Sequence, residues 1–263
     1  MRVFCLAAGT LAKRELVRFY RERSRVVGAI VPPLVFWFLI GSGLGNSFRA
    51  AGAPQGMNYL QYFFPGTVAL VVLFTSIFST ISVIEDRREG FMQSVLVAPI
   101  PRGSLVAGKL LGASLLGFLQ GFLFLLIGPS VGLTMKPLAL LFALGILFLI
   151  SLGLTGLGFA IAWKLDSTQG FHAVMNLFLI PMWMLSGALF PSTGAPMWLK
   201  FLIKLNPLTY GIAALQQSLR AAGTPPLYIG PSRAECAAVI LLFCLATVAA
   251  SMFVARRGDG ASS

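Results

Sequence analysis

Long apolar runs alternate with short polar segments along this chain. Six of the runs are long enough to cross a membrane as helices, because about 20 helical residues span a hydrocarbon core about 30 Å thick. The predicted spans are residues 26–45, 63–84, 105–126, 138–163, 171–190 and 237–254. The pattern therefore predicts an all-α integral membrane protein with six transmembrane helices, organised as a single domain over residues 1–263.

The first 25 residues predict a helix of a different kind. One helical face is apolar and contains Ala8, Ala12, Leu16 and Phe19. Another face is basic and contains Arg14, Arg18, Arg21 and Arg25. A helix with two such faces lies flat in the membrane interface, and its basic face is expected to contact the cytoplasmic leaflet. A cleaved signal peptide is the competing interpretation, but most of the positive charge here follows the apolar run instead of preceding it.

A dense charged segment separates the second and third predicted spans. Residues 85–89 read E-D-R-R-E, and Arg102 and Lys109 follow. We expect this segment to lie in water. Beyond it, Phe91, Met92, Val95 and Leu96 share one helical face. Pro99 and Pro101 end that helix, because proline lacks a backbone donor. The pattern predicts a short amphipathic helix in a loop, on which another protein can push.

Residues 191–235 are too long for a turn and too interrupted for a span. They contain two apolar helical stripes of about ten to fourteen residues, a length too short for a crossing. The dipeptide Asn206-Pro207 separates the two stripes. We therefore expect two re-entrant or interfacial helices before the last span.

Composition agrees with a membrane protein and changes the interpretation of the charge. The chain is 57% hydrophobic and 11% charged, yet its net charge is +12. The cations lie at the ends of apolar runs, so we expect membrane lipids and not nucleic acid as their partners. With both termini inside, fourteen of the twenty Lys and Arg fall in cytoplasmic segments. The positive-inside rule therefore places both termini and the charged segment in the cytoplasm.

Residues that could drive transport or catalysis from within the membrane are sparse. All eight Asp and Glu fall in predicted loops or at span ends, whereas ion-driven carriers keep ionisable groups at mid-membrane. His172 is the only histidine, and the three cysteines have no metal-ligand spacing. We therefore expect energy for transport to arrive through a cytoplasmic contact.

The third predicted span opens with a partial phosphate-binding motif. Residues 103–109 match the first seven positions of a P-loop, but residue 110 is leucine where magnesium binding requires serine or threonine. We expect Lys109 to extend to the lipid headgroups instead. The same span contains two small-xxx-small pairs, which allow helices to approach closely. These are formed by Gly108, Gly112, Gly117 and Gly121.

Together these features resemble the permease subunits of type-2 ATP-binding cassette (ABC) exporters, over essentially the whole chain. The resemblance rests on the order of elements: an amphipathic N-terminal helix, two spans, a charged cytoplasmic segment and four further spans. The charged segment reads E-D-R-R-E-G-x5-L-x2-P-x2-R over residues 85–102, and N-P-L-T-Y follows the fifth span at residues 206–210.

The resemblance implies a half-transporter that pairs with a second copy or a paralogue and with separate ATPase subunits. ATP and magnesium would bind to the ATPase, with no cofactor in this chain. The loop after the second span would form a coupling helix that fits into the ATPase. The implied coupling residues are Glu85, Asp86, Arg87, Glu89, Pro99 and Arg102. The implied re-entrant motif, which helps close the outer side, contains Asn206, Pro207 and Tyr210.

The expected function is therefore transport by a non-enzymatic subunit of the plasma or inner membrane. It would export an amphiphilic drug or lipid-like molecule by alternating access. Three alternatives stay open from the sequence: export of a polysaccharide or lipid-linked glycan, an ion-driven secondary carrier, and a membrane-embedded enzyme that modifies lipids.

Overall fold

The structure is a computed structural model, which describes residues 2–43, 58–97, 101–189, 195–221 and 230–257. Its helices are α1 (Arg2–Arg21), α2 (Arg23–Gly43), α3 (Tyr59–Arg88), α4 (Phe91–Val97), α5 (Arg102–Leu125), α6 (Pro137–Ala162), α7 (Thr168–Trp183), α8 (Met197–Leu205), α9 (Pro207–Ser218) and α10 (Arg233–Arg257). A 3-10 turn, η1 (Gly128–Val131), follows α5, and a π-helical turn, η2 (Met184–Ala188), follows α7. Two short strands, β1 (Leu133–Thr134) and β2 (Arg220–Ala221), pair antiparallel.

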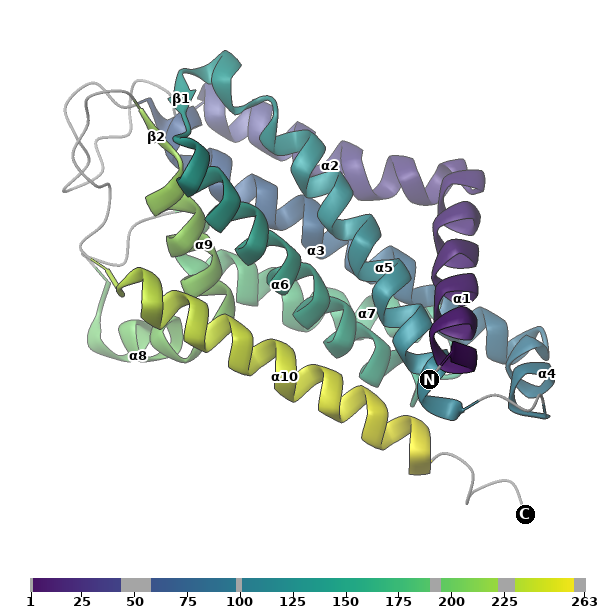
Figure 1. Ribbon diagram of the computed structural model, residues 1–263. Helices are drawn as coiled ribbons and strands as arrows, with labels where there is room; N and C mark the ends of the chain where they lie inside the picture. Colours follow the sequence, from purple (N-terminus) through teal and green to yellow (C-terminus); the bar gives the residue numbers. More distant parts are fainter. Residues whose placement is uncertain (1, 44–57, 98–100, 190–194, 222–229, 258–263) are drawn as a thin grey trace.

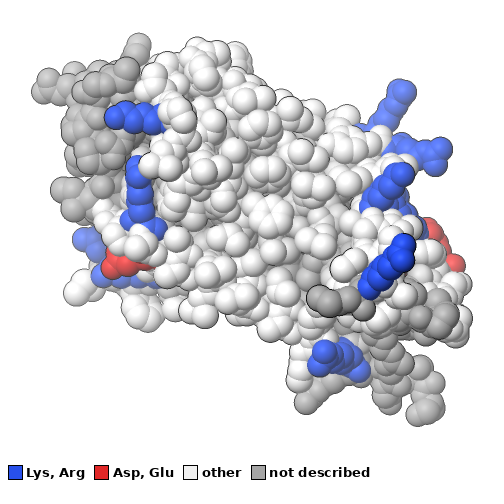
Figure 2. Space-filling model, in the orientation of Figure 1, with Lys and Arg blue, Asp and Glu red and all other residues white. Residues whose placement is uncertain are grey.

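Six helices among the described residues are long and apolar enough to cross a membrane, and they are α2, α3, α5, α6, α7 and α10. Figure 1 shows them side by side, with α1 crossing their ends nearly at right angles and α4 beyond it. Figure 2 shows Lys and Arg gathered at both ends of the molecule, with an uncharged band between them. The predicted all-α architecture with six transmembrane helices is confirmed.

Helix α3 forms the centre of the bundle. In its most apolar stretch 89% of the residues are buried, against 17% for α2 and 22% for α10. It packs against α2, α5, α6, α7 and α9. A helix that is apolar all round is suited to this central place. Helices α2 and α10 instead turn large apolar side chains outward, including Phe38 and Leu242.

Glycines on α5 allow its neighbours to approach closely, as the small-xxx-small pairs predicted. A β-carbon on Gly117 would lie 2.4 Å from Ser151 Oγ of α6, and one on Gly121 would lie 2.7 Å from Val72 of α3. The other pair, Gly108 and Gly112, faces α1. Bulkier residues at these positions would separate the helices that they join.

The turn η2 interrupts the span that begins with α7. Gly187 within it has a φ of 80°, which glycine adopts at little cost. Backbone groups freed inside a membrane need new partners, and α3 supplies two of them. The hydroxyl of Tyr62 donates to the Gly187 carbonyl at 2.9 Å, and that of Tyr59 donates to the Leu189 carbonyl at 2.9 Å.

Candidate functional site

Buried charges gather where α1 crosses the ends of α3 and α5. We call this end of the molecule the α4 end, and the opposite end, which holds α8 and the strands, the α8 end. The group of charges, here named the ion-pair cluster, consists of Arg14, Glu15, Arg18, Arg25, Glu85, Asp86, Glu89 and Lys109.

Asp86 lies at the centre of the ion-pair cluster with no exposed surface. Arg14 binds its carboxylate in a bidentate manner, with nitrogen–oxygen distances of 2.7 and 2.8 Å. Arg18 and Lys109 each place a nitrogen 2.5 Å from a carboxylate oxygen. The hydrogen bond to Asp86 raises the pKa of Arg14 above its usual value, so this cation stays charged. Three cations from two helices thus converge on one carboxylate of a third.

Lys109 does not extend to the lipid headgroups, so that expectation is wrong. Its side chain is 2% exposed, and Nζ lies 2.9 Å from Glu15 Oε1. The reason is the close packing of α1 on α5. A β-carbon on Gly108 would lie 2.7 Å from Leu11, and one on Gly112 would lie 2.8 Å from the Glu15 β-carbon. Helix α1 therefore covers Lys109 and supplies a counter-charge.

The charged segment does not lie wholly in water, which corrects a second expectation. Helix α3 continues to Arg88, so Glu85 and Asp86 belong to its last turns and not to a loop. Asp86 is buried because α1 brings opposite charge directly over it. Glu89, which follows the helix, is 60% exposed and so remains in contact with solvent.

The outer part of the ion-pair cluster joins α1 and α2 to α3. Arg18 Nη2 lies 2.8 Å from Glu85 and 3.4 Å from Glu89. Arg25, which is buried, also binds Glu85. Three of the four arginines predicted for lipid contact thus bind carboxylates, whereas Arg21 is exposed.

Arg87 binds on the other side of α3. It donates to the carbonyl oxygen of Trp163 at 2.5 Å and to that of Leu165, and it pairs with Asp166 at 2.9 Å. These partners form the turn between α6 and α7. The end of α3 is therefore held from two sides, by α1 and α5 through Asp86 and by the α6–α7 turn through Arg87.

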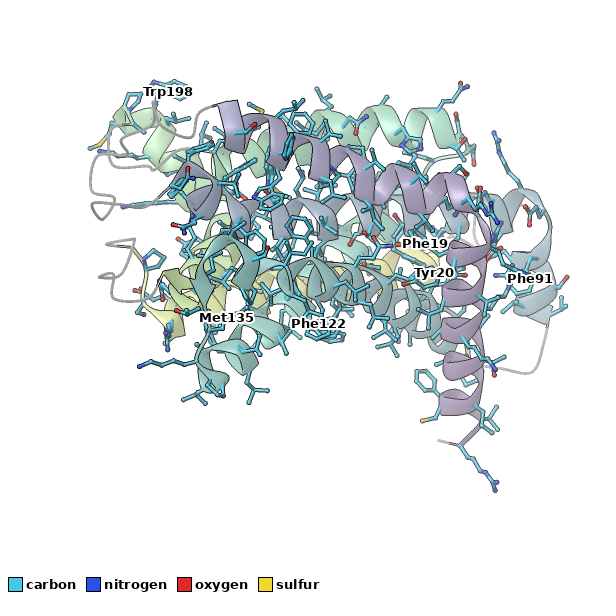
Figure 3. All side chains as sticks on the ribbon, turned by 90° about the horizontal axis from the view of Figure 1, so that it is seen from above. Phe19, Tyr20, Phe91, Phe122, Met135 and Trp198 are labelled. Carbon is cyan, nitrogen blue, oxygen red and sulfur yellow. The ribbon has the colours of Figure 1, made fainter. Side chains whose placement is uncertain are left out.

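The short helix α4 is fixed at its base and open on its outer face. Gly90, with a φ of 75°, turns the chain after α3. The guanidinium of Arg14 lies 3.7 Å from the centre of the Phe91 ring, a cation–π contact that binds α4 to α1. Figure 3 shows Phe91 beside α1. Met92 is buried, whereas Val97 is 85% exposed.

Two predicted coupling residues cannot be placed in the same way. Pro99 lies outside the described residues, and Arg102 begins α5 but its side chain is not described.

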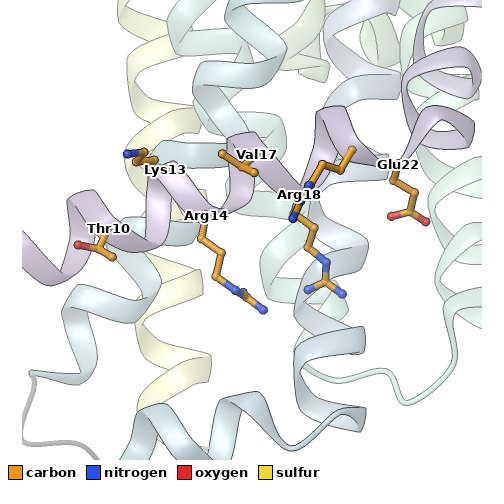
Figure 4. A pocket seen from close by; sticks show the side chains of 7 residues that line it. Thr10, Lys13, Arg14, Val17, Arg18 and Glu22 are labelled. Carbon is orange, nitrogen blue, oxygen red and sulfur yellow. The ribbon is translucent and has the colours of Figure 1, made fainter.

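A basic groove of about 640 Å³ follows the outer face of α1. Its lining residues are Thr10, Lys13, Arg14, Val17, Arg18, Arg21 and Glu22 (Figure 4). Four of these seven side chains are cationic and one is acidic. Because Arg14 and Arg18 also bind carboxylates of the ion-pair cluster, the positive charge that the groove presents to solvent comes mainly from the exposed Lys13 and Arg21.

The predicted re-entrant motif lies at the α8 end, far from the ion-pair cluster (Figure 1). Asn206 accepts from the Leu208 amide at 3.0 Å and donates to the Met182 carbonyl at 2.5 Å. Pro207 occupies the first position of α9, and the Tyr210 hydroxyl donates to the Lys204 carbonyl at 3.0 Å. Asn206, Pro207 and Tyr210 therefore form the corner between α8 and α9.

Sequence reasoning did not identify Glu15 and Lys109 as members of the site. A signal was nevertheless present, because Glu15 lies within a run of arginines and Lys109 lies between Gly108 and Gly112. An acid among cations, together with a cation among small residues, is the pattern of a buried pair between closely packed helices.

Comparison with known proteins gives consistent matches over most of the chain. A family model described as ABC-2 type transporter matches residues 7–219. A putative transport permease, ycf38, from Cyanophora paradoxa is 31% identical, over 78% of this chain and 71% of its own length. Nodulation protein J from Rhizobium meliloti (strain 1021) is 26% identical, over 85% and 84%. The inner membrane transport permease YadH from Escherichia coli (strain K12) is 23% identical, over 86% and 88%.

Proposed function

The chain belongs to the ABC-2 type transporter family, and from this premise we propose that it is the permease subunit of an ATP-driven exporter whose ATPase is a separate chain. The protein is a multi-pass membrane permease. The proposal adds the source of energy, the part of the surface that receives it and the class of cargo.

The observation that carries the proposal is the contact between α4 and the ion-pair cluster, made by Phe91 and Arg14. A force on the outer face of α4 passes to α1 through Phe91 and Arg14, and to α3 through Asp86. Separating buried charges leaves them uncompensated and is strongly unfavourable. The ends of α1, α3 and α5 are therefore expected to move together when an ATPase closes and pushes on α4.

The charge distribution supports a cytoplasmic location for the α4 end. This end carries the basic groove on α1 and the arginines that finish α10, and cytoplasmic segments of membrane proteins are enriched in Lys and Arg. In this orientation the plasma or inner membrane holds the spans, and α8 and α9 lie near the outer surface. ATP and magnesium bind to the partner ATPase.

For the cargo we propose an amphiphilic drug or lipid-like molecule, moved by alternating access between two permease copies. The outward-facing apolar side chains of α2 and α10 suit contact with lipid, with such a molecule or with a second copy. Among the described residues, no group of three His, Cys, Asp or Glu is placed to hold a metal ion.

Substitution on the outer face of α4 tests the ATPase contact. The change Val97→Glu places a charge on an 85% exposed position without touching the ion-pair cluster. We expect co-purification with a co-expressed ATPase of the ABC type to fall at least about tenfold, because a charge at an apolar contact costs more than about 1.4 kcal/mol. The measurement is the ATPase-to-permease ratio after affinity purification.

Leu138→Glu is the matched control, since Leu138 is 78% exposed and lies in the first turn of α6 at the α8 end. This variant should keep the ATPase. If Val97→Glu retains both the ATPase and ATP-dependent transport in vesicles, the assignment of α4 as the contact is wrong. Transport that persists without ATP under an ion gradient would overturn the exporter proposal itself.

A further inference from the structure

A buried amide in the membrane-spanning part of the molecule has half of its hydrogen-bonding capacity unused. Among the described residues, two buried side-chain nitrogens lack a hydrogen-bond partner, Gln120 Nε2 and Gln216 Nε2. Gln120 belongs to α5 and is 3% exposed. Leaving such a donor unpaired costs about 1–3 kcal/mol. A hydrogen-bond acceptor from outside the chain would remove this cost.

The orientation of the Gln120 amide is set by Thr75. The Thr75 hydroxyl lies 2.5 Å from Gln120 Oε1. The same hydroxyl also lies 2.8 Å from the Val71 carbonyl oxygen, so two acceptors face its single proton. In this arrangement the carbonyl oxygen of the amide faces Thr75, and the NH2 group is the end left free to donate.

Gln120 lines a cavity of about 160 Å³ between α2, α3 and α5. The other lining residues are apolar, and they are Ile30, Leu34, Val71, Leu123, Phe124 and Ile127. Leu123 is 58% exposed and Ile127 is 38% exposed, so the cavity opens on the apolar outer surface. An enclosed cavity of about 150 Å³ lined only by apolar side chains stays dry and binds small apolar molecules, and here Gln120 adds one polar group to a lining of that kind. An apolar ligand can therefore enter from the lipid.

The depth of the cavity in the membrane further limits the class of molecule that can bind there. Gln120 follows Lys109 of the ion-pair cluster by 11 residues, which is about 16 Å along a helix axis. With the ion-pair cluster at the edge of a hydrocarbon core about 30 Å thick, Gln120 would lie near the middle of that core. The ester carbonyls of resident phospholipids lie at the edges of the core and do not reach this depth. The acceptor must belong to a molecule whose polar group has entered the membrane interior.

We propose that this cavity binds the apolar part of an amphiphile and that Gln120 donates a hydrogen bond to a carbonyl-type oxygen on it. The site narrows the cargo of the proposed exporter to apolar molecules with an acceptor next to or within the apolar chain. In naming the ligand as cargo, the inference rests on the proposed function. Binding itself requires neither the ATPase nor transport.

Photo-cross-linking of the full chain in lipid nanodiscs tests the site. The probe is a long-chain alkyl benzophenone, an apolar molecule whose ketone is both the acceptor and the photoreactive group. We expect cross-links on residues 123–127, at the end of α5 and just beyond it, and a yield about fivefold lower in Gln120→Met, which keeps the side-chain length but removes the donor. Peptide mapping by mass spectrometry gives both position and yield.

Three comparisons make the result specific. Gln216→Met removes the other unpartnered buried amide, which lies on α9, and should leave the yield unchanged. An alkyl diazirine without an acceptor should label wild type and Gln120→Met equally. Leu123→Trp, which fills the mouth of the cavity, should reduce the labelling by both probes.

The proposal is overturned if wild type is not labelled at these residues, or if Gln120→Met leaves the benzophenone yield unchanged. It is also overturned if both probes lose yield together in Gln120→Met, because the cavity would then have changed shape. Since the assay contains no ATPase, a positive result stands even if the chain proves not to be driven by ATP.

Discussion

At the scale of single residues, Asp86 organises the α4 end. Its carboxylate binds Arg14, Arg18 and Lys109 while fully buried. Charges in such a place need each other, because removing one partner leaves the others buried without compensation. The cluster therefore fixes the relative positions of α1, α3 and α5 more than it adds to the free energy of unfolding.

Asp86→Asn is expected to destabilise the protein by about 3–5 kcal/mol, because it keeps the side-chain shape but leaves buried cations unpaired. The free energy of unfolding in mixed micelles measures the effect. Asp166→Asn is the control, because Asp166 is 94% exposed and should change stability by less than about 0.5 kcal/mol. In a double-mutant cycle with Lys109→Met, the coupling with Asp86→Asn should be about 0.5–3 kcal/mol. Additive effects would mean that the two side chains do not interact.

The sequence shows that Glu85, Asp86 and Glu89 lie close together along the chain. It does not show which of them are buried. Their spacing is local information, and it identified a short amphipathic helix after them. The burial of Asp86 depends on α1, which lies about seventy residues earlier in the chain. Contacts over such a separation leave no periodic signal, so Lys109 was expected among headgroups and found beside Glu15.

At the scale of elements, the interruption of the fifth span at η2 is a built-in break in a membrane helix. Gly187 adopts a positive φ there, and a β-carbon at this position would meet no atom within 4 Å. The cost of a side chain is therefore purely conformational.

Gly187→Ala should destabilise the protein by about 1–2 kcal/mol, because alanine is disfavoured in the left-handed region. Gly145→Ala is the matched control, since Gly145 also has open space but lies within helix α6. That change should be neutral or slightly stabilising. Thermal unfolding of both variants in the same detergent distinguishes them, and equal midpoints would contradict the left-handed conformation of residue 187.

The packing of α1 on α5 gives another element-scale prediction. Gly112→Ala places a β-carbon 2.8 Å from the β-carbon of Glu15 and 2.9 Å from the Ala12 carbonyl, so the two helices must separate. We expect a loss of about 1–3 kcal/mol and a several-fold rise in the reactivity of Lys109 toward an amine-modifying reagent. Mass spectrometry reports the modified fraction.

Gly103→Ala serves as the comparison on the same helix, because its added β-carbon would lie 3.5 Å from the Phe4 ring, an ordinary contact. Lys109 should stay protected there. If Lys109 reacts equally in Gly112→Ala and wild type, α1 does not cover it.

The elements themselves were largely predictable. Twenty apolar residues in a row specify a membrane helix almost without regard to context, and the described part of the chain contains six such helices. The boundaries were less certain. Helix α3 begins at Tyr59 and ends at Arg88. Its end lies beyond the predicted residue 84 because the charged last turn is stabilised by partners on α1 and by the carbonyls that Arg87 binds.

At the scale of the whole molecule, function was read from the order of elements more than from any single residue. The charged segment and N-P-L-T-Y lie at opposite ends of the structure (Figure 1), yet both contributed to the resemblance. The cavity beside Gln120 left no comparable signal, because its lining comes from three helices that are distant in sequence.

The central position of α3 limits where a cargo can cross. Helices α2, α5, α6, α7 and α9 all pack against it, so parting them would break the van der Waals contacts that hold membrane helices together. A cargo would therefore travel along the outside of one bundle, with one wall made by this chain. Under the proposed exporter function, the opposite wall would come from a second bundle, so the proposal requires pairing for passage of the cargo.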